Sequence, residues 1–307
     1  MTRSDKSGWR GFGEGGEDRD RRGMGVENRM RWFITGASKG FGRAIAQAAL
    51  ERGDTVFGTV RGEADAAAFA ALAPGPAPGP APGLATGLVA DVTDRAAIDR
   101  AVAAAGEIDV LVNNAGVGIT GAIEEYSGED VRALFDVNVF GAIAVLQAVL
   151  PGMRARRAGR ILNITSVSGW APWAGTALYG ATKFALECVG RTLAQEVAHY
   201  GIRVTNVAPG GLRTDFSAAS LRSASNPIKG YEGPAHEAER TLRGHAGEEP
   251  GNPVLAAAAV LRVVDSPEPP LRLLLGADAL GYAEGEMVAM KADIDAWRET
   301  TLSIAYR

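Results

Sequence analysis

Short apolar runs alternate with longer alanine-rich segments from Met30 onward, and this alternation is the feature that most limits the possible folds. The apolar runs are continuous rather than alternating in polarity, which is typical of strands buried on both faces. The segments between them carry charges at helical spacing, so the pattern predicts an α/β fold with a parallel sheet covered by helices. The expected strands are 31–35, 55–60, 87–90, 109–113, 160–164, 203–207 and 271–275.

Composition limits the classes of protein to which this chain can belong. A chain of 307 residues can bury a substantial core, and its formal net charge of −4 gives no indication of a nucleic-acid partner. Cys188 is the single cysteine, so this sequence cannot form an intramolecular disulfide, and we expect a reducing, cytoplasmic location. The three histidines have no ligand-like spacing, which argues against a metal site. They are His199, His236 and His245.

Composition also marks the ends and insertions of the domain. Residues 1–29 are rich in Gly, Arg, Asp and Glu, so we expect a disordered tail followed by one domain over residues 30–307. The Pro/Gly/Ala repeat at 73–83 cannot continue a helix and predicts a surface loop. The polar segment 215–253 is too long for an ordinary connection and is expected to form a substrate lid. We find no pattern of a signal peptide and expect no membrane span.

A glycine-rich loop follows the first expected strand and precedes an amphipathic helix. Gly36, Gly40 and Gly42 allow the backbone to turn tightly and to approach a ligand closely. The helix presents free N–H groups and the positive end of its dipole to an anion, so the expected ligand is a pyrophosphate. A plain strand-to-helix turn is the alternative interpretation.

Tyr179 and Lys183 are four positions apart in a segment that otherwise has the pattern of an apolar helix, so both lie on one helix face. A free tyrosine has a pKa of about 10, and a nearby ammonium group favours the phenolate and lowers that pKa. Such a pair can supply the proton that carbonyl reduction needs. The alternative is an apolar ring that is covered by the lysine stem.

Several motifs occur together in an order that resembles the short-chain dehydrogenase/reductase family across residues 30–215. They are the glycine loop 36–42, Asp91, the turn 113–116, Ser166, Tyr179, Lys183 and the segment 209–210. The resemblance implies a single Rossmann-type domain, a doubly wound sheet of seven parallel strands in the order 3-2-1-4-5-6-7 flanked by helices. The C-terminal part is similar to the branch that includes retinol- and hydroxysteroid-dehydrogenase-like members.

The resemblance implies a catalytic set of Asn138, Ser166, Tyr179 and Lys183. Tyr179 would be the general acid and base, and the Ser166 hydroxyl would hydrogen-bond the substrate oxygen. Ser166 lies thirteen positions before Tyr179, as in the family, whereas Ser168 is out of register. Asn138 would distort its helix and hold a water molecule linked to Lys183. The alternative for Asn138 is a buried amide that is satisfied in the core.

A nicotinamide cofactor is implied by the resemblance, and charge indicates which one. An NAD site generally has an acidic residue after the second strand, whereas the 2′-phosphate of NADP attracts cations. Arg61 occupies this place and Lys39 lies in the glycine loop, so we expect NADP(H), unless both are merely solvated surface cations. The expected cofactor-binding residues are Gly36, Ser38, Lys39, Gly40, Phe41, Gly42, Arg61, Asp91, Val92, Asn113, Ala115, Gly116, Tyr179, Lys183, Pro209, Gly210 and Thr214.

Family geometry leaves two local alternatives open. Asp91, with Val92, would contact the adenine ring, or Asp91 would cap the helix that begins near 93–94. Trp170 and Trp173 would border an apolar substrate pocket, or they would pack against the expected lid.

The expected function is an NADP(H)-dependent oxidoreductase that interconverts a carbonyl and an alcohol on a small, apolar substrate. The alternatives are a nucleotide-binding sensor or scaffold, and a lyase or epimerase with the same fold. The resemblance also implies a homodimer or homotetramer, formed by the helices that begin near Gly128 and Leu178.

Overall fold

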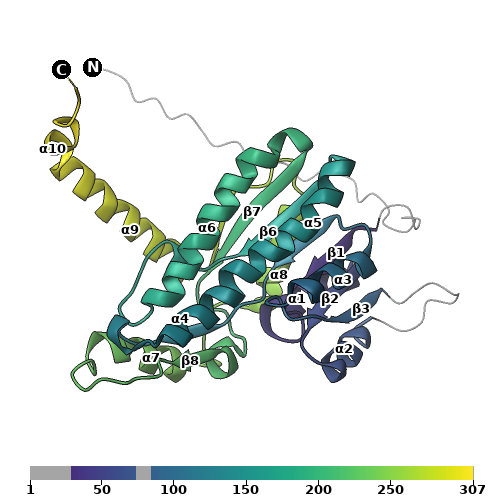
Figure 1. Cartoon of the computed structure of the whole chain (residues 1–307), viewed down its shortest axis with the longest axis horizontal. Helices are drawn as coiled ribbons and strands as arrows, with labels where there is room; N and C mark the ends of the chain where they lie inside the picture. Colours follow the sequence, from purple (N-terminus) through teal and green to yellow (C-terminus); the bar gives the residue numbers. More distant parts are fainter. Residues whose placement is uncertain (1–28, 74–83, 307) are drawn as a thin grey trace, which may run out of the picture.

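The computed structural model describes residues 29–73 and 84–306. Apart from Arg29 and Ala73, the expected tail and proline-rich loop lie outside these residues. The main sheet has the order β3-β2-β1-β4-β6-β7-β9 and is parallel throughout. Because β6, β7 and β9 are its fifth, sixth and seventh strands along the chain, the predicted order is confirmed (Figure 1). The strands are β1 (Arg31–Ile34), β2 (Thr55–Val60), β3 (Ala85–Val89), β4 (Val110–Asn113), β6 (Gly159–Ile164), β7 (Ile202–Pro209) and β9 (Arg272–Leu275).

Helices cover both faces of this sheet and bury its two apolar sides. Trp32 and Ile34 of β1 lie in the core cluster that contains α1 and α8, whereas Phe33 lies in the cluster with α3, α5 and α6. Successive side chains of a strand point to opposite faces, so one continuous apolar run serves both layers. The helices are α1 (Gly40–Glu51), α2 (Glu63–Ala70), α3 (Arg95–Ala105), α4 (Gly128–Phe135), α5 (Ala142–Arg156), α6 (Ala177–Val197), α7 (Pro234–Gly244), α8 (Pro253–Asp265), α9 (Ala277–Ala296) and α10 (Arg298–Leu302).

The segment 215–253 contains more regular structure than its sequence pattern indicates. It includes a π-helical turn (Phe216–Ser220), the strand β8 (Leu221–Ser223) and helix α7. β8 pairs in parallel with β5 (Gly118–Thr120), and this second sheet was not expected from the sequence. Since β5 follows the turn after β4, the pairing attaches the segment beside the carboxyl end of the main sheet.

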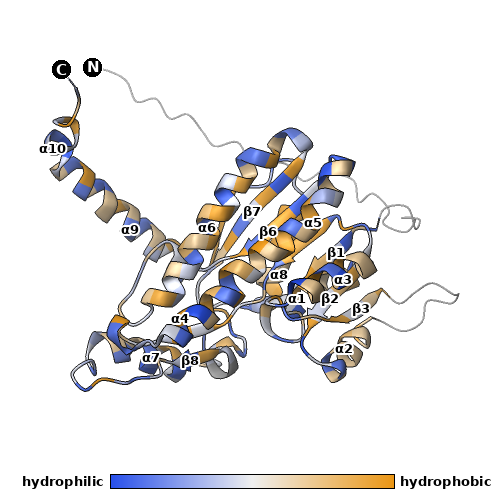
Figure 2. Ribbon diagram, viewed as in Figure 1, coloured by the Kyte–Doolittle hydropathy of each residue, from blue (hydrophilic) through white to orange (hydrophobic). Residues whose placement is uncertain are grey.

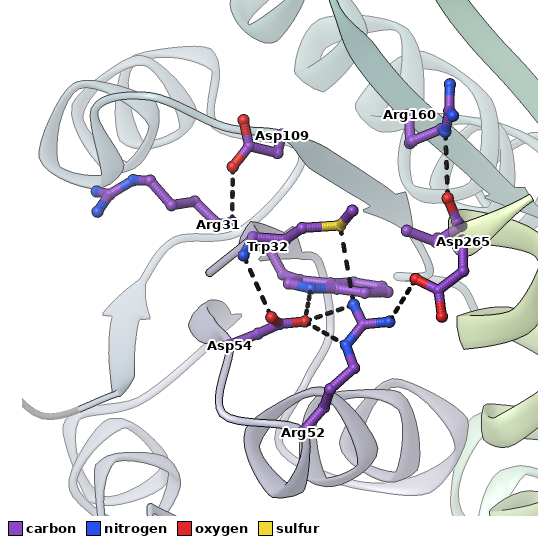
Figure 3. A network of polar contacts seen from close by, with 9 residues as sticks. Arg31, Trp32, Arg52, Asp54, Asp109, Arg160 and Asp265 are labelled. Carbon is purple, nitrogen blue, oxygen red and sulfur yellow. Dashed lines mark hydrogen bonds and ion pairs between the residues drawn. The ribbon is translucent and has the colours of Figure 1, made fainter. Parts of the chain in front are cut away.

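A polar cluster ties the amino ends of the first strands to α1 and α8 (Figure 3). Asp54 accepts hydrogen bonds from the Trp32 indole and from Arg52 Nε, both at 2.8 Å. Arg52 also forms an ion pair with Asp265 at 2.7 Å. This cluster closes the amino edge of the sheet, so it stabilises the fold at the edge opposite the carboxyl ends of the strands.

The helix expected to begin near Gly128 extends to Arg156 and is interrupted. α4 passes into a π-helical turn at Asp136–Gly141, and α5 continues to Arg156. Among the described residues, one helix, Gly128–Arg156, is long and apolar enough to cross a membrane by length and composition alone. Val145 and Val149 of α5 are buried in the core, as in a helix that covers a sheet.

The C-terminal helix differs from the prediction. Helix α9 begins at Ala277, well before the short helix near 292–298 that the C-terminal sequence pattern predicts, and Trp297 separates α9 from α10. Gly281 and Gly285 weaken the helical signal of its sequence, since glycine disfavours helix interiors. α9 projects away from the rest of the molecule (Figure 1).

Candidate functional site

The predicted site residues gather at the carboxyl edge of the sheet, where ligands bind in open parallel α/β sheets. The glycine loop follows β1, the turn 113–116 includes the end of β4, and Ser166 follows β6. The segment 209–214 extends from the end of β7, and α6 carries the Tyr179–Lys183 pair. Residues far apart in the sequence therefore meet at one edge.

The backbone of the glycine loop leaves space for a ligand at the amino end of α1. Gly36 and Gly40 have φ angles of 65° and 60°, in the left-handed region that favours glycine. A Cβ atom on Gly42 would lie 2.4 Å from Asn114 Nδ2, so a side chain has no room there. No side chain of the described residues caps α1, whose first N–H groups are available to an anion. These features fit the pyrophosphate of a dinucleotide.

Thr35 and Asn114 hold the glycine loop against the turn after β4, although neither was among the predicted cofactor residues. The Thr35 hydroxyl accepts hydrogen bonds from the N–H groups of Asn114 and Ala115 at 2.9 and 3.0 Å. The Asn114 amide donates to the carbonyl oxygens of Thr35 and Gly36 at 2.9 and 3.0 Å. The only indication in the sequence was their position: Thr35 directly precedes the glycine loop, and Asn114 lies in the turn 113–116.

Cations surround this loop. Lys39 precedes α1 and Arg61 follows β2, both are exposed, and no ion pair within the described part of the chain includes either. Arg43, in the first turn of α1, donates a hydrogen bond to the Ser38 carbonyl oxygen at 3.4 Å. The loop therefore offers positive charge that can stabilise a phosphate group.

Three predicted cofactor residues have buried side chains that are not presented to a ligand. Phe41 lies in the hydrophobic core. Val92 packs closely against Gly141, because a Cβ atom added to Gly141 would lie 2.7 Å from the Val92 side chain. Asn113 is 3 % exposed, and its amide hydrogen-bonds within the sheet. For these residues the contact with the cofactor stays a prediction.

The structure separates the two roles considered for Asp91. Asp94, rather than Asp91, caps α3, since its carboxylate accepts a hydrogen bond from Ala97 N at 3.0 Å. Asp91 is exposed and accepts hydrogen bonds from the Thr93 N–H and hydroxyl groups at 2.9 and 2.7 Å. The contact of Asp91 with adenine stays a prediction.

Tyr179, Ser166 and Lys183 lie together at the end of β6 and the start of α6. The Tyr179 phenol lies beside the Ser166 side chain, and Lys183 Nζ lies 5.6 Å from the centroid of the Tyr179 ring. Lys183 is 5 % exposed and donates a hydrogen bond to the Ile164 carbonyl oxygen at 2.9 Å. Ser168, the alternative serine, donates its backbone N–H to Ser166 Oγ at 3.1 Å.

Burial changes the acid–base properties of this group. It raises the pKa of the Tyr179 phenol to about 12, and contact with the Ser166 side chain opposes this rise. Burial also lowers the pKa of the Lys183 ammonium group to about 8, whereas the carboxylate of Glu187 opposes that decrease. In the protein alone, desolvation is the largest cause of the shift in the Tyr179 pKa, and the lowering of this pKa by Lys183 stays a prediction.

Asn138 connects this group to the turn after β4 and lies in the π-helical turn between α4 and α5. Its Oδ1 accepts a hydrogen bond from Val117 N at 2.9 Å, and its Nδ2 donates to the Val117 carbonyl oxygen at 2.9 Å. Nδ2 also donates to the Thr182 hydroxyl at 3.1 Å. The helix is thus distorted at Asn138, as expected, because a π-helical turn departs from the usual bonding pattern. The role of Asn138 in holding water stays a prediction.

A buried carboxylate that the sequence analysis missed lies one helical turn beyond Lys183. Glu187 is 5 % exposed and accepts hydrogen bonds from the Thr165 hydroxyl at 2.6 Å, the Trp170 indole at 3.2 Å and the Asn206 amide at 2.9 Å. Trp170 is therefore held by Glu187, and its place beside the substrate stays a prediction.

A ladder of amide groups extends this network across the sheet. Asn163 Nδ2 donates to Asn206 Oδ1 at 3.0 Å, and Asn113 Nδ2 donates to Asn163 Oδ1 at 3.1 Å. The three asparagines are paired in register across β4, β6 and β7. An asparagine in each of three apolar strands was the available sequence signal, but it has meaning only once the strand order and register are known.

Phe216 brings the segment 215–253 to Tyr179. Its ring centroid lies 5.9 Å from that of Tyr179, and a Cβ on Gly118 would lie 3.0 Å from its Cζ atom. Thr214 lies beside the glycine loop, since a Cβ on Gly40 would be 3.7 Å from Thr214 Cβ. The start of the segment thus reaches both halves of the site.

Glu125 anchors the same segment through contacts with Ile228 and His236. This buried carboxylate accepts hydrogen bonds from Ile228 N and from His236 Nε2, both at 2.7 Å, and from Ala122 N. Burial alone would raise the pKa of Glu125, but these backbone and histidine contacts lower it below its usual value. The segment is therefore held to the body by a charged group on the β5 side.

Comparison with known proteins agrees with this geometry. A family model described as short chain dehydrogenase matches residues 31–224. The chain is 36 % identical over 280 residues to Oxidoreductase BOA17 of Botryotinia fuckeliana (strain B05.10), which covers 89 % of this chain and 98 % of that protein. The crystal structure of a short-chain dehydrogenase from Streptomyces avermitilis aligns with a TM-score of 0.83 and 37 % identity, covering 91 % of this chain and 99 % of that one.

The predicted branch is supported in part. Retinol dehydrogenase 8 of Bos taurus is 35 % identical over 176 residues, which cover 54 % of this chain and 55 % of that protein. The family model and the similarity to BOA17 each cover a larger part of the chain. They show that the chain is an oxidoreductase that belongs to the short-chain dehydrogenase family.

Proposed function

We propose that the protein interconverts a carbonyl and an alcohol with NADP(H), and that Tyr179 is the general acid and base. The observation that carries this proposal is the cluster of Tyr179, Ser166 and Lys183 at the same sheet edge as a glycine loop that fits a dinucleotide. The nicotinamide, when bound, supplies or accepts the hydride. The side chains of the chain supply the proton and orient the substrate oxygen.

The raised pKa of Tyr179 suits a proton donor. The phenol holds its proton at neutral pH, so it can donate to the oxygen of a carbonyl group as negative charge develops there. Ser166, which lies beside this phenol, orients the same oxygen. Lys183 places a positive charge near the ring, which stabilises the phenolate left after proton transfer. These roles make redox chemistry the better supported function, compared with a lyase, an epimerase or a nucleotide sensor.

The pH profile tests the role of Lys183. Its pKa of about 8 means that the ammonium charge is present below this pH and is lost above it. We expect kcat/KM for reduction to fall by about tenfold per pH unit above about pH 8. A Lys183→Arg variant keeps its charge at all these pH values, so any activity it retains should lack this fall. Lys291→Arg, on an exposed helix, is the control and should keep the fall; a flat profile in the unmutated protein would contradict the role.

Cofactor choice is tested by reversing charge at Arg61. We expect the unmutated protein to prefer NADPH, and Arg61→Asp to lower the NADPH-to-NADH ratio of kcat/KM by about 10- to 100-fold, since a charge-assisted contact with phosphate is lost. Arg154→Asp makes the same charge change on an exposed residue at the end of α5, away from the glycine loop, and should leave the ratio unchanged. A preference for NADH in the unmutated protein would refute the charge argument.

We infer an apolar ketone, aldehyde or secondary alcohol as substrate. Phe216 packs against Tyr179, and Trp173 is partly exposed just after the Ser166 turn, so apolar and aromatic surface lies close to the reacting groups. Retinol dehydrogenase 8, to which part of the chain is similar, is named for a lipophilic alcohol. Loss of NADPH absorbance over a panel of apolar ketones, aldehydes and quinones tests this substrate class, with small polar ketones as the comparison.

Location and assembly belong to the same proposal. A cytoplasmic enzyme fits the single cysteine, Cys188, which is exposed and has no disulfide partner in the sequence. Association through α4, α5 and α6 is supported by Phe140 and Phe184, large apolar side chains that are exposed on these helices or the turn that joins them.

A further inference from the structure

Helix α9 exposes an unusual amount of apolar surface. Met287, Met290, Ile294 and Trp297 are each about half exposed or more. The helix projects from the body, and apolar residues recur along its length (Figure 2). An apolar helix face of this kind normally packs against a partner, because leaving it in water forfeits the hydrophobic stabilisation of burial.

The apolar residues follow the spacing of a coiled coil. From Leu280 to Ile294 in α9 the steps are three, four, three and four residues, and a further step of three reaches Trp297, which directly follows the helix, so these residues occupy a and d positions of successive heptads. Tyr282 and Val288 are exposed apolar residues of α9 that lie outside this pattern. Ala283 is fully buried at the base of the helix, and the exposed part of this seam begins at Met287. The seam residues are Leu280, Ala283, Met287, Met290, Ile294 and Trp297.

The charges beside the seam indicate which partner fits. Within α9, Glu286 and Asp293 occupy g positions, and Lys291 occupies the e position five residues after Glu286. In a parallel pair of identical helices, each g residue faces the e residue of the next heptad on the partner. Glu286 would therefore meet Lys291 of the second copy, a pair of opposite charge within α9.

We propose that α9 is a self-association element that pairs in parallel and in register with α9 of a second copy of this chain. An antiparallel pair would bring the acidic g positions of the two copies together, which opposes association. A membrane surface fits less well, because acidic residues outnumber Lys291 and Arg298 along α9 and α10, and anionic lipids attract basic helices.

Lys291 and Arg298 can exchange their present ion-pair partner for one on a second copy. Lys291 and Arg298 both contact Asp295, on the side of the helix away from the g positions, and all three side chains are about half exposed or more. Surface ion pairs of this kind contribute little, so an exchange for pairs across an interface costs little.

The first turn of α9 is hydrogen-bonded to the segment 209–214, which extends from the end of β7. Asp278, in its first turn, accepts a hydrogen bond from Gly211 N at 2.7 Å. The contact joins α9 to the segment after β7 that is predicted to receive the nicotinamide. The helix is thus attached to the site edge of the domain.

The full chain is used to test this proposal by sedimentation velocity over a range of concentrations. Ile294→Glu should remove one step of assembly, from tetramer to dimer or from dimer to monomer, and weaken that step by at least about thirtyfold. Val288→Glu is the matched control, because Val288 is more exposed than Ile294 but lies outside the seam, and it should have little effect. Circular dichroism of both variants verifies that each is folded.

Charge exchange tests the parallel arrangement. Glu286→Lys and Lys291→Glu should each weaken the same assembly step, and the double variant should restore it, because the opposite charges again face each other. In a Cys188→Ser background, Met290→Cys should form a disulfide between two copies, whereas Ala289→Cys should not. The proposal is overturned if assembly is unaffected by Ile294→Glu, if the double variant gives no rescue, or if the chain stays monomeric and binds anionic vesicles through this helix.

Discussion

Tyr179→Phe is expected to lower kcat/KM for carbonyl reduction by about 100- to 10,000-fold, the usual contribution of a positioned general acid. The phenylalanine ring keeps the packing against Phe216 and removes only the hydroxyl group that lies beside Ser166. The rate of NADPH oxidation with the best substrate of the panel gives the measurement. Because the phenol is the proton source, the loss should appear mainly in kcat.

Two controls separate chemistry from binding and folding. NADPH affinity, measured by fluorescence titration, should change little in Tyr179→Phe, because the glycine loop and Arg61 are intact. Ser166→Ala should cause a smaller loss, since it removes an orienting hydrogen bond and leaves the phenol in place. Turnover by Tyr179→Phe at the unmutated rate would refute the assignment of the general acid.

Glu187→Ala is expected to lower the free energy of unfolding by about 3–5 kcal/mol, the range for breaking a buried charged network. The change leaves the Thr165 hydroxyl, the Trp170 indole and the Asn206 amide without their common acceptor. It also removes the buried negative charge four residues from Lys183. Urea denaturation followed by circular dichroism gives the measurement, with Glu196→Ala, an exposed glutamate of the same helix, as control.

Glu187→Gln distinguishes a positioning role from a merely structural one. The amide keeps the size of the side chain and one oxygen acceptor but removes the charge that opposes the fall in the pKa of Lys183. The alkaline fall in kcat/KM should therefore begin at a lower pH than in the unmutated protein. A less stable variant with an unchanged pH profile would assign Glu187 to folding alone.

The positions of the strands followed from the sequence because burial on both faces of a sheet demands continuous apolar runs. Residues 31–35, 55–60 and 160–164 correspond closely to β1, β2 and β6. The glycine loop was equally visible, because positive φ angles at Gly36 and Gly40 need glycine whatever surrounds them. These are local requirements, and local requirements can be recognised one segment at a time.

The pairing of β5 with β8 could not be recognised in this way. Both strands are short, and each is satisfied only by a segment about a hundred residues away, so neither has a strong pattern of its own. The same holds for the Asn113–Asn163–Asn206 ladder, whose members meet because the strand order and register place them side by side. Non-local contacts of this kind appear only when the chain has folded.

The sequence by itself determined the sheet, the phosphate-binding turn and the order of the motifs, since periodicity and glycine content express burial and backbone geometry directly. Only the tertiary structure decided the acid–base properties of the site. The pKa values of Tyr179 and Lys183 depend on how far each is removed from water and on the buried charge of Glu187. The spacing of Tyr179 and Lys183 brought the two groups together, but desolvation, a property of the whole fold, shifts the pKa of each group.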